Sequence, residues 1–280
     1  PVPIRLGSGI GMEVTSKAPI DPAENSQFTA SIVGWEGESA PASYTGSAKT
    51  WQTTITTTAS TTAVDVPTWG ATQFYNQDED VNTYMIAWHP EGTLADDATT
   101  VSFENDGTQD AMIAQMVSGN TNTTTDPVLE FTHASAQIIF KVQTENAEVQ
   151  VNNLQSITIN DVNVITGFDL SNYSAIASTT EQDVNVTIDL KGQKINNTTA
   201  IEAGEGVMIA PDRKDITIDV KADDILYDNQ AVTLSSTNIE AGKSYIITLT
   251  FKRQGITVDA TVEAWQPGSQ TDDDGQVDLI

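Results

Sequence analysis

The stretch "LEFTHASAQIIFKV", residues 129–142, decides how this chain folds. Its apolar residues fit one face of an amphipathic helix, because Phe131, Ile138 and Val142 fall on helical spacing. They also alternate as in β-strands, first at Leu129 and Phe131 and then, in the opposite parity, at Ile138 and Val142. The stretch is therefore either one buried helix or two strand segments joined at a kink.

The rest of the chain favours strands. Threonine, valine and isoleucine are abundant, and β-branched side chains pack well on a pleated sheet. Period-two alternation runs through "DVNVTIDLK" (183–191) and "DITIDVKA" (215–222), and no long amphipathic helix is evident. We therefore interpret residues 129–142 as two strand segments, with a bulge or bend around residues 132–135.

The clearest hairpin is predicted at "SYIITLTFKRQGITVDATVEAW", residues 244–265. Apolar residues alternate up to Phe251 and again from Ile256, on either side of a short turn that contains Gly255. Short strands separated by Asn, Gly, Asp and Pro clusters indicate β-sandwiches. The hairpin thus supports an all-β fold.

The length of 280 residues suggests two domains. We place the boundary just after the strand in "QIIFKVQ", which gives a first domain over 1–147 and a second over 148–280. The sequence therefore predicts an all-β protein with two β-sandwich domains in tandem.

The net charge of −27, from 12 basic and 39 acidic residues, excludes a nucleic-acid partner, since such a chain repels phosphate. The same charge disfavours anionic membrane surfaces. The absence of cysteine excludes disulfides, thiolate metal sites and cysteine nucleophiles. No apolar run approaches the ~20 residues that span a bilayer.

No catalytic, cofactor or metal site is predicted. His133 is expected to be a structural histidine in a strand, and His89 has no partner with metal-ligand spacing. A serine nucleophile lacks a base and a G-x-S-x-G motif. "TDDDGQVDL" (271–279) fails the pattern of a calcium loop, and "RLGSGIG" (5–11) lacks the lysine and the helix of a phosphate loop.

Several blocks of the sequence together resemble the fimbrillin-like (Mfa-like) family, whose members are subunits of type V pili. In order these are "VNTYMIAWHP" (81–90), "DAMIAQMVSG" (110–119), "LEFTHASAQIIFKV" (129–142), "ITINDVNVITGFDLS" (157–171), and the terminal "IEAGKSYIITLTF" (239–251) with "ITVDATVEAWQPG" (256–268). The resemblance spans nearly the whole chain.

The resemblance implies two transthyretin-like β-sandwich domains and a structural, non-enzymatic protein of a cell-surface fimbria. Such a subunit would be exported as a lipoprotein precursor to the outer membrane and would polymerise by donor-strand exchange. Its partners would be other copies or related pilins, a trypsin-like processing protease and a ligand on a host surface. No cofactor is implied.

In this scheme "VPIRLGSGI" (2–10) is the strand that is displaced, with Val2, Ile4 and Leu6 alternating inward. Proteolysis is expected after Lys17, which stands where the family usually has Arg. Arg5 is a second candidate, although it lies inside the expected strand.

The candidate donor strand is "GQVDLI" (275–280), with its alternating Val277 and Leu279. Two alternatives stay open. One is a surface glycan-binding β-sandwich lipoprotein that uses Trp51 and Trp69 as a stacking platform, although core packing is the preferred role of these tryptophans. The other is a secreted hydrolase with a carboxylate pair.

Overall fold

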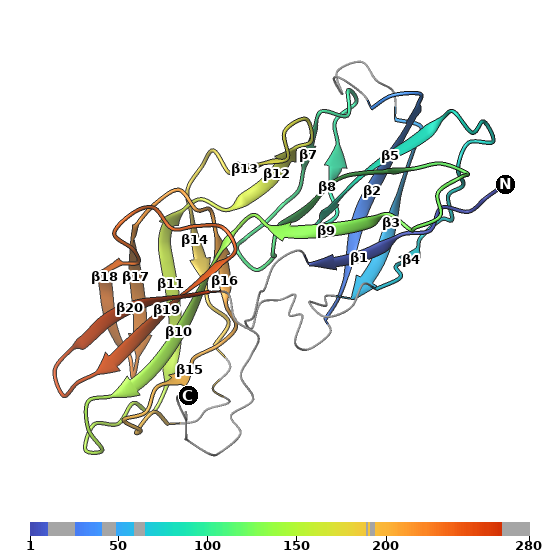
Figure 1. Ribbon diagram of the computed structural model, residues 1–280. Coiled ribbons are helices and arrows are strands. Elements are labelled where there is room, and N and C mark those ends of the chain that lie inside the picture. Colours follow the sequence, from blue (N-terminus) through green and yellow to red (C-terminus); the bar gives the residue numbers. More distant parts are fainter. Residues whose placement is uncertain (11–25, 41–48, 59–64, 189, 191–193, 265–280) are drawn as a thin grey trace, which may run out of the picture.

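The computed structural model describes residues 1–10, 26–40, 49–58, 65–188, 190 and 194–264. These residues form strands, turns and loops but no helix, so none of the described segments is a helix able to cross a membrane. Two lobes of packed β-sheets lie end to end (Figure 1). The predicted all-β fold with two tandem domains is confirmed.

The N-terminal lobe is built on a seven-stranded sheet in the order β1-β9-β8-β5-β2-β3-β4. A second sheet, in the order β13-β12-β7-β6, packs against one of its faces. The strands of the first sheet are β1 (Gly7–Ile10), β2 (Gln27–Gly37), β3 (Trp51–Thr58), β4 (Thr68–Trp69), β5 (Asn82–His89), β8 (Met112–Gly119) and β9 (Val128–His133). Those of the second are β6 (Thr93–Leu94), β7 (Thr100–Ser102), β12 (Ile165–Asp169) and β13 (Ser174–Ala177).

Both faces of the seven-stranded sheet are apolar. Strand β2 sends Ala30 and Ile32 to the cluster on one face, and Val33 and Trp35 to the cluster that meets the second sheet. A strand buried on both sides reads as a continuous apolar run rather than as an alternating one. This explains why the central strands of this lobe look less regular in sequence than those of the other lobe.

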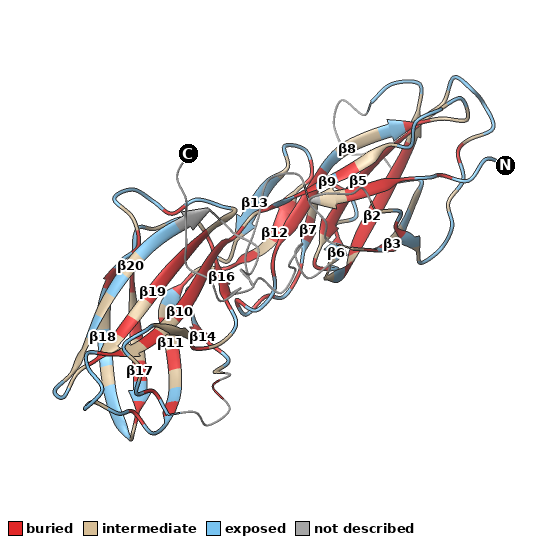
Figure 2. Cartoon of the chain, turned by 60° about the horizontal axis from the view of Figure 1, so that its bottom comes forward, coloured by how far each residue is buried: buried red, intermediate tan, exposed pale blue. Residues whose placement is uncertain are grey.

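The C-terminal lobe is a sandwich of two sheets around one core. The first sheet has the order β15-β10-β19-β20, with β16 also paired to β10, and the second has the order β14-β11-β17-β18. The strands of the first are β10 (Ala136–Thr144), β15 (Ile201–Glu202), β16 (Val207–Ile209), β19 (Lys243–Phe251) and β20 (Ile256–Ala264). Those of the second are β11 (Leu154–Val162), β14 (Gln182–Asn185), β17 (Asp215–Ala222) and β18 (Ile225–Thr233). Figure 2 shows the buried residues on the inner strands and the exposed ones on β18 and β20.

The stretch 129–142 carries the chain from the N-terminal lobe into the C-terminal lobe. Strand β9 ends at His133 and β10 begins at Ala136, so the prediction of two strand segments is confirmed. The parity changes because the two halves face different cores: Phe131 is buried in the N-terminal lobe and Phe140 in the C-terminal lobe. The kink is thus one of the points where the chain passes between the lobes (Figure 1).

The domain boundary after residue 147 stays a prediction. Two elements on either side of it pair with strands of the lobe to which the boundary does not assign them. Strand β10, placed in the first domain by sequence, pairs with β16 and β19 in the C-terminal lobe. The hairpin β12–β13, placed in the second domain, pairs through Gly167 and Phe168 with β7 of the N-terminal lobe. Local alternation identifies a strand but carries no information on its partner, because pairing depends on distant residues.

The predicted strands of the C-terminal lobe are largely present. The hairpin around Gly255 forms between β19 and β20, with a register from Lys243↔Ala264 to Phe251↔Ile256. In "DVNVTIDLK" strand β14 ends at Asn185. Among the described residues that follow, the Val186 N–H donates to the Ile157 carbonyl at 3.0 Å, and Ile188 forms an isolated bridge with Gly204.

Strand β16 ties the lobes together. Val207 and Ile209 lie in the core of the C-terminal lobe, whereas Met208 lies in one cluster of the N-terminal lobe and Ala210 in the other. The Met208 N–H donates to the Gly107 carbonyl at 2.7 Å. Gly107 has a φ of +91°, and a Cβ there would lie 2.6 Å from Val184, so only glycine fits this approach.

Candidate functional site

The start of the chain completes the seven-stranded sheet. Residues 2–10, here called the closing segment, pair on one side with β9 in parallel, from Gly7↔Val128 to Ile10↔Phe131. The Gly7 N–H also donates to the Pro127 carbonyl at 2.9 Å. One edge of the sheet is therefore covered by this segment.

The other side of the closing segment is hydrogen-bonded to residues 65–75, which follow β3 at the opposite edge. The Ile4 N–H donates to the Gln73 carbonyl at 2.9 Å, and the Val2 carbonyl accepts from the Tyr75 N–H at 3.0 Å. Ser8 and Asp65 exchange two backbone hydrogen bonds of 2.8 Å each. The sheet thus curls until its two edges meet at the closing segment.

The inward row of the closing segment is apolar at its centre. Ile4 and Leu6 are 2% and 1% exposed and belong to the same cluster as Phe131, whereas Arg5 between them is exposed. Val2, expected to face inward, is instead 44% exposed. It lies at the outer end of the segment, where the cluster no longer covers it.

A polar contact follows the two aliphatic residues. The Ser8 hydroxyl is hydrogen-bonded to the Thr57 hydroxyl, and Thr57 Oγ1 donates to Asp65 Oδ2 at 3.2 Å. The same Asp65 oxygen accepts from the Thr58 N–H at 2.9 Å. Ser8 and Thr57 are both buried. Sequence reasoning missed this contact, because nothing local to these residues indicates that they meet.

The two histidines hold strands rather than a ligand. His133 Nδ1 lies 2.7 Å from Asp110 Oδ2, and both side chains are buried. His89 Nδ1 lies 2.7 Å from the Thr29 carbonyl, and burial lowers the pKa of His89. The described residues contain no group of three potential metal ligands. A structural role for His133, as predicted, fits these contacts.

The two tryptophans of the glycan alternative pack against each other and against the N-terminal core. The ring centroids of Trp51 and Trp69 are 5.9 Å apart in an edge-to-face arrangement. A Cβ on Gly34 would lie 2.3 Å from the Trp51 ring, so the indole lies directly on the β2 backbone. Both side chains are half-buried at the sheet edge, which fits core packing better than a sugar platform.

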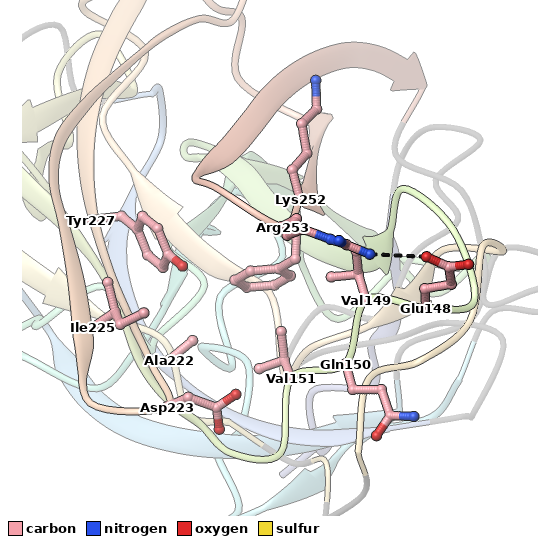
Figure 3. Close-up of a pocket in the computed structure, with 11 residues that line it drawn as sticks. Glu148, Val149, Gln150, Val151, Ala222, Asp223, Ile225, Tyr227, Lys252 and Arg253 are labelled. Atoms are coloured by element: carbon pink, nitrogen blue, oxygen red, sulfur yellow. Dashed lines mark hydrogen bonds and ion pairs between the residues drawn. The ribbon is translucent and has the colours of Figure 1, made fainter.

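A pocket of about 260 Å³ lies at the end of the C-terminal lobe (Figure 3). Phe251, one of its lining residues, is only 1% exposed, and Tyr227 contacts it edge to face. The acidic groups of the lining are engaged: Glu148 pairs with Arg253 at 2.9 Å, and Asp223 accepts from the backbone of residues 152–153. The arrangement offers an open depression with a mixed polar and apolar lining, not a set of convergent catalytic groups.

The remaining predicted site residues lie outside the described part of the chain. These are the processing candidate Lys17, the donor candidates Val277 and Leu279, and the acidic stretch 271–279.

Comparison with protein families shows to which family the chain belongs. A model of the fimbrillin-like family matches residues 23–265. The chain belongs to the fimbrillin-like family. This is a structural family rather than an enzyme family, which confirms the prediction of a non-enzymatic protein. The closing segment precedes the matched region of this fimbrillin-like protein.

Solved structures show the same fold in distant relatives. A cell adhesion protein of Bacteroides uniformis aligns with a TM-score of 0.60 at 19% identity, over 94% of this chain and 98% of that one. A cell adhesion protein of Bacteroides ovatus has a TM-score of 0.60 at 16% identity, with coverages of 95% and 99%. A fimbrial protein of Bacteroides vulgatus has a TM-score of 0.51 at 15% identity, with coverages of 94% and 99%. The curated proteins contain no match.

Proposed function

We propose that this fimbrillin-like protein is a structural subunit of a cell-surface fimbria, joined to its neighbours by strand exchange at the closing segment. The observation that carries the proposal is that this segment is hydrogen-bonded on both sides. Its removal would expose the backbone of β9 and of residues 65–75, and would empty the space that Ile4 and Leu6 fill. Such a groove is a template for an extended segment of another chain.

The donor is a strand from a neighbouring copy or a related pilin, for which "GQVDLI" (275–280) is our candidate. Val277 and Leu279 have the same two-residue spacing as Ile4 and Leu6, and the residue between them would take the exposed place of Arg5. Each fully buried aliphatic side chain would contribute about 1.5–3 kcal/mol. Slow exchange would make such a fibre durable without disulfides.

Processing is assigned to a trypsin-like protease that cuts after Lys17, between β1 and β2. Arg5 is the weaker candidate, because Ile4 and Gly7 on either side of it are hydrogen-bonded through their backbones. The subunit would reach the cell surface as a lipoprotein precursor and support adhesion, with a host-surface ligand as a further partner.

Limited digestion with trypsin followed by electron microscopy tests the proposal. The parent protein is expected to form filaments, or ladders on a gel, after cleavage. The Lys17→Ala variant is expected to stay monomeric, whereas the control Arg5→Gln behaves as the parent. If Lys17→Ala polymerises as readily as the parent, the cleavage site is wrong, and if the cleaved parent stays monomeric, the proposed function is wrong.

A further inference from the structure

We infer that Thr57 and Asp65 form a selective subsite of the groove, which accepts a small residue with a hydroxyl group two positions after the second inward aliphatic residue. The inference rests on the proposed function, because it concerns which strand the opened groove accepts. Ser8 of the closing segment occupies this subsite in the structure.

The inward row of the closing segment consists of Ile4, Leu6 and Ser8, and all three side chains are buried. The apolar part of the groove therefore ends at Leu6, and the next inward position is lined by the hydroxyl group of Thr57. Ser8 Oγ also lies 3.5 Å from the Asp65 carbonyl, a longer contact than the 3.2 Å from Thr57 Oγ1 to Asp65 Oδ2. We take Thr57 to donate to the carboxylate, which leaves the Ser8 hydroxyl to donate to Thr57 Oγ1. The result is a directed chain of hydrogen bonds that ends on a carboxylate.

Both size and polarity are selected at this position. Ser8 is fully buried with its Oγ against the Thr57 hydroxyl, so a branched or longer side chain would overlap Thr57. An alanine would fit, but it would leave the buried Thr57 oxygen without its donor. A buried polar atom that loses its partner weakens the complex.

The backbone at Ser8 fixes the register of the incoming strand. Ser8 exchanges two hydrogen bonds with Asp65 on one side, and it lies opposite Leu129 of β9 on the other. A slip by one residue would turn the aliphatic residues outward. The favoured strand therefore reads aliphatic, any residue, aliphatic, any residue, then serine. The candidate donor of residues 275–280 supplies the two aliphatic residues of this pattern but not the serine.

Peptide competition on the cut chain tests the subsite. The full chain would carry a site for a sequence-specific protease in place of residues 15–20, and would be cut there. Fluorescent peptides of residues 1–10, all with Arg5→Gln, would then compete for the groove. Relative to this peptide, Ser8→Ala is expected to bind about fivefold more weakly and Ser8→Val more than tenfold. The control Val2→Ala, at an exposed position, is expected to bind equally well.

A second protein variant shows whether Thr57 is responsible. In Thr57→Val the parent and Ser8→Ala peptides should bind alike, whereas in Thr57→Ser the preference for Ser8 should persist. A preference for Ser8 that survives in Thr57→Val overturns the subsite. Equal binding of the three Ser8 peptides by the parent chain also overturns it, while leaving the groove and the proposed function intact. Failure of every peptide to bind overturns both.

Discussion

The two lobes use their strands in opposite ways. In the N-terminal lobe, β1 pairs with β9 over only four residue positions and meets the other edge of the sheet through isolated bridges. In the C-terminal lobe, β10 pairs with β19 over eight positions, and β19 pairs with β20 over nine. Strand β1 lies at an edge of its sheet, whereas β10 and β19 are interior strands of theirs.

The closing segment, where we propose that neighbouring subunits join, is thus less deeply paired than the strands at the centre of the C-terminal lobe. Loss of the closing segment would leave the pairing among the other six strands of its sheet unchanged. Loss of β10 would divide its sheet, since β15, β16 and β19 all pair with it. If the proposed strand exchange takes place at the closing segment, the C-terminal lobe would hold the subunit together while the N-terminal lobe exchanges its strand.

The largest effect is expected from Phe140→Ala in the middle of β10. Phe140 is 1% exposed, and truncation of a buried aromatic side chain lowers the free energy of unfolding by about 3–5 kcal/mol. Guanidinium unfolding followed by circular dichroism measures this loss. Lys141→Ala, on the next and less buried position of the same strand, is the control. A loss below about 1 kcal/mol for Phe140→Ala would break the contrast between the lobes.

A smaller and local effect is expected from Leu6→Ala in the closing segment. The substitution removes buried aliphatic contacts at a cost of about 2–3 kcal/mol, near the low end for leucine. Hydrogen exchange should become faster in β9 and in residues 65–75, while amides of β10 and β19 keep their protection. The exposed Val2→Ala serves as the reference. Uniformly faster exchange in both lobes would show that the closing segment is not separable.

The smallest effect is a pH dependence from His89 in the N-terminal lobe. Burial lowers the pKa of His89 below its ordinary value of 6.5. At a pH between the lowered pKa of the folded chain and the ordinary pKa of the unfolded chain, the unfolded chain binds more protons at His89. The contribution of His89 to the free energy of unfolding is therefore fully present above pH 6.5 and is lost as the pH falls below that value towards the lowered pKa. The His89→Gln variant should lose less stability than the parent between pH 7.5 and 5. Thermal unfolding at both pH values measures this, and equal losses would exclude His89 as the source.

The sequence was sufficient to predict the fold class and most strands of the C-terminal lobe. The alternation in "DITIDVKA" and the turn at Gly255 are local signals, and β17 alternates between buried and less buried positions. Partners were not predictable in the same way. Strand β10 and the hairpin β12–β13 cross between lobes, and only contacts between distant residues determine this.

The sequence predicted the apolar contacts of the closing segment, but it did not predict the polar contact of Ser8. Ile4 and Leu6 could be chosen from their alternation in sequence. Ser8, by contrast, meets Thr57 and Asp65 across 49 and 57 residues of chain, and a serine among glycines carries no signal of burial. Val2 was misplaced because alternation does not show where a groove ends.

The short strand β16 has a mechanical consequence for a filament under tension. Its residues and the one that follows, from Val207 to Ala210, reach into each of the three hydrophobic clusters formed by the described residues. The β9–β10 connection and the pairing of β12 with β7 also join the lobes, so a pull applied to either lobe is carried by β16 together with these links. The subunit would resist flow as a single rigid unit, and both lobes would unfold together and not one after the other.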